Sequence, residues 1–309
     1  MIACTLPPGM EEQLMALGTK EEIMREYGML AYVPGEIADR VMCGVWALRR
    51  VRGVGLENLG SLELDKRGFF EREDCLRYAC RAGVDFSIIR SLYESLSGLE
   101  IMTYSRQSAT EDGMRCAARG GLLEIVEAFI ETLGVDVDAV HPLDCKTALM
   151  FAAENGHTDI VNALAGTHNA NVEAVDNEGW TALMWAARNG HTDTVNVLAG
   201  THNANVEAVS QYGRTVLMCA AVRGRTDIVN VLAGTHNANV EAVDQNGSTA
   251  LLLAAEWGHT DTVNALAGRH KANVEAVDGH GMTALMRAAR NGHIDTVEAL
   301  RALGASSEW

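Results

Sequence analysis

The sequence predicts an all-α solenoid of stacked helix pairs, and three observations support this fold class. Threonines recur every 34 residues, and each opens a similar block of sequence such as TALMFAAENGHTDIV. Within each block the apolar residues have the spacing of one helix face. A unit of this length cannot bury that face alone, so neighbouring units must stack. The five threonines are Thr147, Thr181, Thr215, Thr249 and Thr283.

The first helix of each unit has clear start and stop signals. Thr147 precedes this helix in the first unit, where its hydroxyl can accept a hydrogen bond from a free amide of the first turn. Leu149, Ala152 and Ala153 then form a small apolar face that lets neighbouring helices approach closely. Gly156 is expected to end the helix, because glycine is favoured just past a helix C-terminus.

A second, antiparallel helix is expected from Thr158. Asp159 lies in its first turn, where the helix dipole favours a negative charge. Leu164 belongs to its apolar stripe, and Gly166 is expected to end it. Asn169 follows in the loop, at a place where the left-handed conformation suits asparagine.

The order D-x-x-G-x-T-x-L-x-x-A-A-x-x-G-H-x-D-x-V, followed by A-N-V, resembles the ankyrin repeat. The resemblance covers residues 142–309 in five clear units. Residues 107–141 look like a sixth unit, and residues 68–106 like a strongly degenerate seventh. The resemblance implies helix-turn-helix repeats with projecting β-turn tips, such as 176–179, and one continuous solenoid over 68–309.

The repeats depart from the family pattern at three places. The family's T-P-L-H is mostly T-A-L-M here, and the loop after the second helix carries one extra residue in most units. Glutamate also replaces the usual asparagine before the turn. We expect these glutamates to form a solvated acidic stripe, which could attract a basic partner. They are Glu173, Glu207, Glu241 and Glu275.

The first 67 residues lie outside the repeats and have helical periodicity over 10–32 and 35–53. The simplest role is a helical cap that covers the exposed face of the terminal repeat. A helix pair that recruits other proteins is the alternative, because 35–53 has an apolar and a basic face. The sequence therefore divides into a helical region at 1–67, degenerate repeats at 68–141, and the five clear repeats.

The composition excludes several classes of protein. The chain has 309 residues and a formal charge of −16, of which residues 107–309 carry −13. An acidic surface repels phosphate backbones, so we expect no nucleic-acid partner. The apolar stretches are too short to span a membrane, and the first residues carry no secretory signal. Seven scattered cysteines are typical of a reducing compartment, so we expect an intracellular protein, cytoplasmic or nuclear.

Nothing in the sequence indicates catalysis. Eight of the ten histidines occupy two recurring repeat positions. Stacked helices lie about 8–10 Å apart, whereas Zn–N bonds are about 2.0–2.1 Å, so these histidines cannot share one metal. The glutamates are equally too far apart for a catalytic carboxylate pair. We expect no catalytic residue, no metal and no cofactor.

The positions that vary inside the fixed frame are the candidates for recognition. On the first helix one such position holds Phe151, Trp185, Cys219, Leu253 and Arg287 in successive units. The resemblance implies that these faces and the turn tips line a concave partner-binding surface. Trp, Tyr and Arg are enriched in binding hot spots, so we expect exposed contact residues here. The set is Lys146, Phe151, Glu178, Trp180, Trp185, Arg188, Tyr212, Arg214, Arg223, Asn246, Trp257, His280 and Arg287.

Phe151 and Trp185 have an alternative, purely structural interpretation: they could merely fill space between adjacent first helices.

Three functions follow from the whole sequence. We expect a non-catalytic interaction module or scaffold subunit that binds one or more proteins, and no small molecule. An adaptor, such as a ubiquitin-ligase substrate receptor whose residues 1–67 recruit the ligase, is the alternative. An enzyme with an unrecognised site in residues 1–106 is the third hypothesis.

Overall fold

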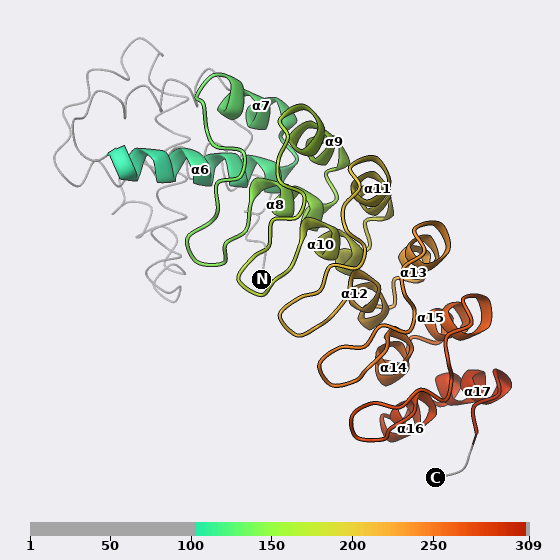
Figure 1. Cartoon of the computed structure of the whole chain (residues 1–309). Helices are drawn as coiled ribbons and strands as arrows, with labels where there is room; N and C mark the ends of the chain where they lie inside the picture. Colours follow the sequence, from blue (N-terminus) through green and yellow to red (C-terminus); the bar gives the residue numbers. More distant parts are fainter. Residues whose placement is uncertain (1–102, 307–309) are drawn as a thin grey trace, which may run out of the picture. The chain divides into compact units, whose positions relative to one another are not determined.

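The computed structural model describes residues 103–306, with side chains from Thr110 onward, and these residues fold into helices joined by loops (Figure 1). The described residues contain no strand, only two isolated bridges, Val209 with Thr215 and Val277 with Thr283. The predicted all-α class is confirmed. The helices predicted at 10–32 and 35–53, and all but the end of the unit predicted at 68–106, lie outside the described residues.

The chain divides into two compact parts, residues 1–135 and 136–309. In the first part, α6 (Thr103–Gly120) and α7 (Leu123–Glu131) pack as a helix-turn-helix. Gly121 turns the chain between them with a φ of 77°. The helix pair that the sequence predicts here is therefore present.

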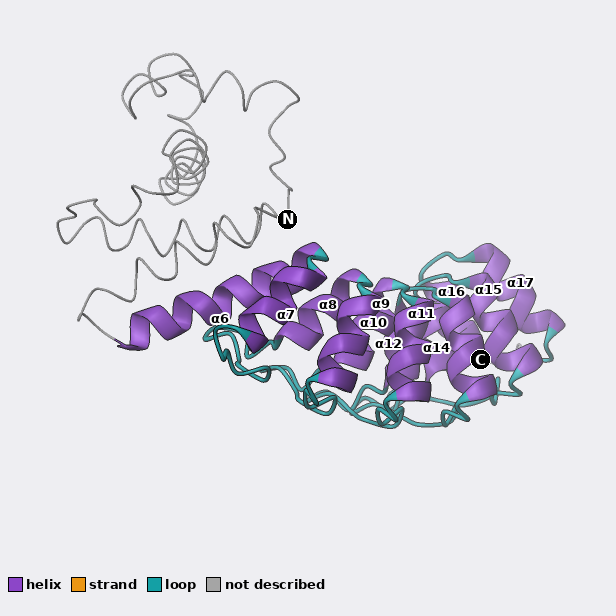
Figure 2. Ribbon diagram, turned by 90° about the horizontal axis from the view of Figure 1, so that it is seen from above, coloured by secondary structure: helices purple, strands orange, loops and turns teal. Residues whose placement is uncertain are grey.

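The second part, residues 136–309, is a stack of five helix pairs, one for each repeat unit. Figure 1 shows the first helices in one row and the second helices in another, and Figure 2 shows the connecting loops along one edge. The first helices are α8 (Ala148–Asn155), α10 (Ala182–Asn189), α12 (Val216–Val222), α14 (Ala250–Glu256) and α16 (Ala284–Arg290). The second helices are α9 (Thr158–Asn162), α11 (Thr192–Asn196), α13 (Thr226–Asn230), α15 (Thr260–Val263) and α17 (Ile294–Ala302).

Local signals start and end the first helices as predicted. The Thr147 hydroxyl accepts a hydrogen bond from the Met150 amide at 3.3 Å, and the equivalent threonine begins each first helix. Gly156 ends α8 in the left-handed conformation, with a φ of 76°. The core lies between the two rows, where Leu149, Ala152 and their equivalents in the next repeats are almost completely buried.

The second helix does not end at Gly166, so that prediction is wrong. After Asn162 the helix widens into one π-helical turn, in which the His168 amide donates to the Ala163 carbonyl at 3.0 Å. A π turn accommodates one more residue than an α turn. The extra residue therefore lies inside the helix rather than in the loop. The π turns are η3 (Ala163–Thr167), η4 (Val197–Thr201), η5 (Val231–Thr235) and η6 (Asn264–Arg269).

The loop after the π turn has the predicted backbone. Asn169, Asn203 and Asn237 are left-handed, with φ between 54° and 55°. Lys271 takes this place in the fourth unit, with a φ of 61°. The asparagine is therefore favoured at this position but not required.

The glutamate stripe also joins the repeats. One carboxylate oxygen of Glu173 accepts a hydrogen bond from the Asn205 amide of the next unit at 2.8 Å. Glu207 and Glu241 make the same bond to the units that follow them, and Glu275 binds the Ser306 amide. The stripe is acidic and exposed, but it is part of the framework as well as of the surface.

Histidines form a second set of bonds between repeats. His191 Nε2 lies 3.0 Å from the Glu154 carbonyl oxygen, and His259 and His293 approach the equivalent carbonyls at the same distance. Arg225 replaces the histidine in the third unit and donates from Nε to the Arg188 carbonyl at 3.4 Å. These side chains hold the ends of neighbouring first helices together.

Candidate partner-binding site

One aspartate holds the turn tip in the second, fourth and fifth units. Asp176 Oδ1 accepts hydrogen bonds from the amides of Glu178 and Trp180, both at 2.9 Å. Its other oxygen accepts from the indole Nε1 of Trp185 at 3.0 Å. The tip is thereby tied to the first helix of its own unit. Ser210 takes the place of this aspartate in the third unit and accepts the same amides with a neutral hydroxyl.

Two of the predicted contact residues are buried. Trp180 is only 7% exposed, because its ring packs on Trp185 with the ring centroids 4.9 Å apart. Lys146 is 8% exposed, with Nζ 3.3 Å from the centroid of the Trp185 ring and 2.9 Å from a carboxylate oxygen of Glu154. The expectation that these side chains are exposed is wrong. Lys146 and Trp180 lie just before α8 and α10, and their packing against Trp185 removes both side chains from water.

Phe151 and Trp185 belong to the same cluster. The Lys146 ammonium also lies 5.5 Å from the centroid of the Phe151 ring. Both aromatic side chains are half-buried between adjacent first helices. Their packing agrees with the space-filling alternative, although neither side chain is fully buried.

Arg287 uses its donors inside the stack. Its guanidinium donates to Asp278 Oδ2 at 2.6 and 3.0 Å, to Glu256 Oε2 at 2.7 Å and to Ser248 Oγ at 2.7 Å. Burial alone would raise the pKa of Asp278. The backbone amide of Met282, the Arg287 guanidinium and the amide of His280 outweigh burial and lower the pKa below its usual value. This arginine is therefore a clamp between two repeats.

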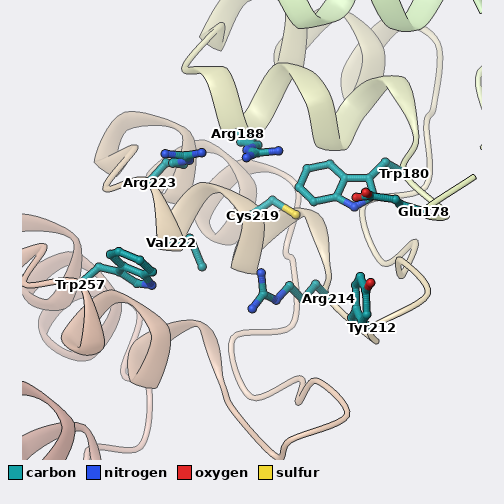
Figure 3. Close-up of a pocket in the computed structure, with 9 residues that line it drawn as sticks. All are labelled: Glu178, Trp180, Arg188, Tyr212, Arg214, Cys219, Val222, Arg223 and Trp257. Carbon is teal, nitrogen blue, oxygen red and sulfur yellow. The ribbon is translucent and has the colours of Figure 1, made fainter. Parts of the chain in front are cut away.

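A pocket of about 330 Å³ gathers seven of the thirteen predicted residues (Figure 3). Its walls come from the second, third and fourth units, and its floor is α12. In Figure 3 the side chains of Arg188 and Arg214 lie on opposite sides of Cys219. The lining residues are Glu178, Trp180, Arg188, Tyr212, Arg214, Cys219, Val222, Arg223 and Trp257.

The cavity exists because two side chains on its floor are short. Cys219 occupies the position that Trp185 and Arg287 fill in the second and fifth units. Val222 likewise stands where the other units carry the longer Glu154, Arg188, Glu256 and Arg290. Cys219 and Val222 are the lining residues that the predicted set omits. Their signal in the sequence is a small residue at a position that is long elsewhere.

The charge of the pocket differs from that of the rest of the stack. The third unit, 210–243, carries three arginines against Asp227 and Glu241, whereas each of the other four units has a net negative charge. Arg188 lies over the two indoles, with Cζ 5.2 Å from the Trp180 ring centroid and 5.6 Å from that of Trp185. Among the carboxylates of the described residues, only that of Asp244 lies near Arg214, with Oδ2 4.0 Å from Nε. The pocket is a cationic, aromatic site on an acidic chain.

The Cys219 thiol is not a nucleophile in this setting. Burial raises its pKa to about 12, and the nearby charges of Arg214 and Arg188 lower it only in part. Thiol reactivity requires the thiolate, which is scarce at neutral pH for such a group. Cys219 therefore contributes a small, apolar floor.

The remaining predicted residues lie away from the pocket. Asn246 and His280 are exposed on the tips of the fourth and fifth units. Within residues 103–306 no group of three or more His, Cys, Asp and Glu side chains could hold a metal ion. No helix in this part of the chain is both long and apolar enough to cross a membrane.

Stacked helix pairs with hydrogen-bonded turn tips define a helical-repeat protein. The family model for ankyrin repeats, which contains three copies of the repeat, matches residues 113–210, 176–244 and 217–308. These matches cover more than half of the chain, and the chain belongs to the ankyrin-repeat family. Ankyrin repeats generally mediate protein–protein interaction. No individual curated protein matches the sequence closely enough to be called a relative.

Proposed function

We propose that the chain is a non-catalytic interaction module that binds a protein partner in the pocket of the second, third and fourth units. One observation carries this proposal: residues from three repeats converge on one cavity whose rim holds two exposed aromatic rings. Trp257 is 59% exposed and Tyr212 is 54% exposed. Aromatic and arginine side chains around a desolvated pocket are the usual composition of a binding hot spot.

The framework around the pocket supports binding by a preformed surface. Arg188 lies over the indoles of Trp180 and Trp185, and the tip that carries Trp180 is tied to its helix through Asp176. A site that is already ordered loses less conformational entropy when a partner binds. We therefore expect the pocket to keep its shape in the complex.

The residues of the pocket also support the non-catalytic part of the proposal. No histidine lines it, and its one thiol is held protonated by burial. Glu178 is its one carboxylate and lies exposed on a turn tip. Such a set offers contact area and charge, without a nucleophile paired to a base.

Scaffold and adaptor roles differ in what residues 1–67 do. Deletion of these residues from an adaptor would remove its recruited machinery and spare the partner that the repeats select. A scaffold subunit would keep no such separation, because both regions would contact the same assembly. Pull-downs with the full chain and with the deletion variant, compared by mass spectrometry, distinguish the two roles.

The pocket itself is tested by cross-linking mass spectrometry on a pull-down from native lysate. The test variant is Tyr212→Ala/Arg214→Ala/Trp257→Ala, which spares the buried Trp180. The matched control is Arg269→Gln/Arg290→Gln, which changes exposed residues outside the pocket. We expect a partner that cross-links beside the pocket and is lost only in the test variant. A partner retained by both variants would place binding elsewhere.

A further inference from the structure

The arginines of the pocket have fewer and longer ion pairs than Arg287 of the fifth unit. Among the described residues Arg214 makes one, with Asp244 at 4.0 Å, whereas Arg287 makes two. Arg287 is 13% exposed in its side chain and binds Asp278 and Glu256. Within the part of the chain that the structure describes, Arg188 and Arg223 have no carboxylate within 4.0 Å. The cationic groups of the pocket therefore retain donors for an external anion.

Two residue differences in the third unit leave this positive charge with fewer carboxylates beside it. Ser210 replaces the aspartate of the turn, so Arg214 has no carboxylate in its own unit comparable to the Asp278 that binds Arg287. Val222 stands where Glu154 and Glu256 place a carboxylate in the first and fourth units. An acid is thus missing at two places, and the space left by the second is the pocket.

We propose, building on the function above, that the pocket takes a short acidic segment of the partner. A carboxylate of that segment lies between the guanidinium groups of Arg188 and Arg214, over the floor formed by Cys219 and Val222. An apolar residue next to it packs on Trp257. Arginine binds carboxylates through paired, charge-assisted hydrogen bonds. The position of Arg188 over two indoles orients its guanidinium beforehand.

A peptide fits this site better than a nucleic acid does. The chain carries a net charge of −16, and the glutamate stripe runs along the same repeats. A long polyanion extends beyond the Debye length of about 8–10 Å and meets this repulsion. A short acidic segment lies within that distance of the three arginines and is attracted locally.

The test is a selection of short random peptides, displayed on phage, against the full-length chain. We expect enrichment of peptides that contain Asp or Glu beside an apolar residue. These peptides should bind Arg188→Gln/Arg214→Gln at least about tenfold more weakly. The control Arg269→Gln/Arg290→Gln removes the same charge outside the pocket and should bind them unchanged. Binding should also weaken as salt concentration rises.

A second variant tests the missing acid directly. Val222→Glu restores the residue that Glu154 and Glu256 supply in other units, so the fold should tolerate it. The new carboxylate should pair with the arginines and abolish binding of the acidic peptides. Val222→Gln has the same size without the charge and should retain more of the binding. Equal binding by the two variants would overturn the proposal.

The outcomes separate this inference from the proposed function. Selection of neutral or basic peptides that need Trp257 overturns the acidic segment but keeps the pocket as a partner site. Peptides that bind all variants equally overturn both. Displacement of the selected peptides by single-stranded oligothymidine, with no acidic peptide competing as well, reassigns the pocket to nucleic acid and overturns the inference.

Discussion

The hydroxyl oxygens of Thr226 and Thr262 lie 2.8 Å apart, across the interface between two second helices. Thr262 is completely buried, so this hydrogen bond satisfies a hydroxyl that water cannot reach. The next unit repeats the pair with Thr260 and Thr296. One repeat before Thr262, however, Ile228 fills the equivalent buried position without a hydroxyl.

We predict that Thr226→Val costs about 1–2 kcal/mol in the free energy of unfolding, because Thr262 then keeps a buried hydroxyl without its partner. The double variant Thr226→Val/Thr262→Val should recover much of this loss, since both partners become apolar. Chemical unfolding of the two single variants and the double variant measures the coupling. Additive losses would show that the hydroxyl pair contributes nothing.

Two glycines with the same backbone provide a second prediction. Gly258 and Gly292 have φ values of 72° and 75°, but a Cβ on Gly258 would lie 2.5 Å from His293 Nδ1. A Cβ on Gly292 would meet nothing within 4 Å. Gly258→Ala should therefore lower the melting temperature more than Gly292→Ala, by an amount that reflects displacement of His293 from the Glu256 carbonyl. Thermal unfolding decides this, and equal shifts would contradict it.

The pH dependence of stability should include a contribution from Asp278. Its folded pKa lies below the ordinary value of 3.8, so the unfolded chain binds its proton more readily. The stabilisation is fully present above that value and is lost as the pH falls through the folded pKa. The stability difference between the wild type and Asp278→Asn should thus shrink below about pH 4. Urea titrations from neutral to acidic pH test this, and a constant difference would refute it.

Cys219 should resist alkylation in the folded chain. A pKa of about 12 instead of 9.0 leaves roughly a thousandfold less thiolate at mildly alkaline pH. We expect iodoacetamide to modify the half-buried Cys145 much faster than Cys219, as followed by peptide mass spectrometry. In urea the two thiols should react at comparable rates. Rapid labelling of Cys219 without urea would show that the floor of the pocket opens to solvent.

The local features of the fold could be predicted because each depends on residues close in sequence. Thr147 caps α8 by accepting a hydrogen bond from an amide only three residues further along the chain, and Gly156 ends α8 through its own backbone conformation. The π turn could not be predicted in this way, because the sequence does not distinguish a longer helix from a longer loop after Gly166. The hydrogen bond from the His168 amide to the Ala163 carbonyl places the extra residue in the helix.

The candidate site could be predicted only in part, because its burial depends on neighbouring repeats. Trp180 is aromatic and occupies a variable position, which favours an exposed contact residue. In the structure its ring packs on Trp185, which in turn contacts Lys146 of the preceding repeat, and the sequence does not reveal this packing. The pocket is harder still, since it arises where Cys219 and Val222 leave room. A search for large contact residues passes over the small ones that make the space.

The bonds between units have a consequence for how such an array changes in length. Three successive interfaces use the same glutamate acceptor and asparagine amide donor, in the pairs Glu173–Asn205, Glu207–Asn239 and Glu241–Asn273. The segment LAGTHNANVEAV that supplies them is identical in three units. Recombination between these segments would add or remove a whole unit without creating an unmatched junction. The residues that join the units thus preserve the stacking when a unit is gained or lost. The few non-repeated residues of the third unit are free to diverge in specificity.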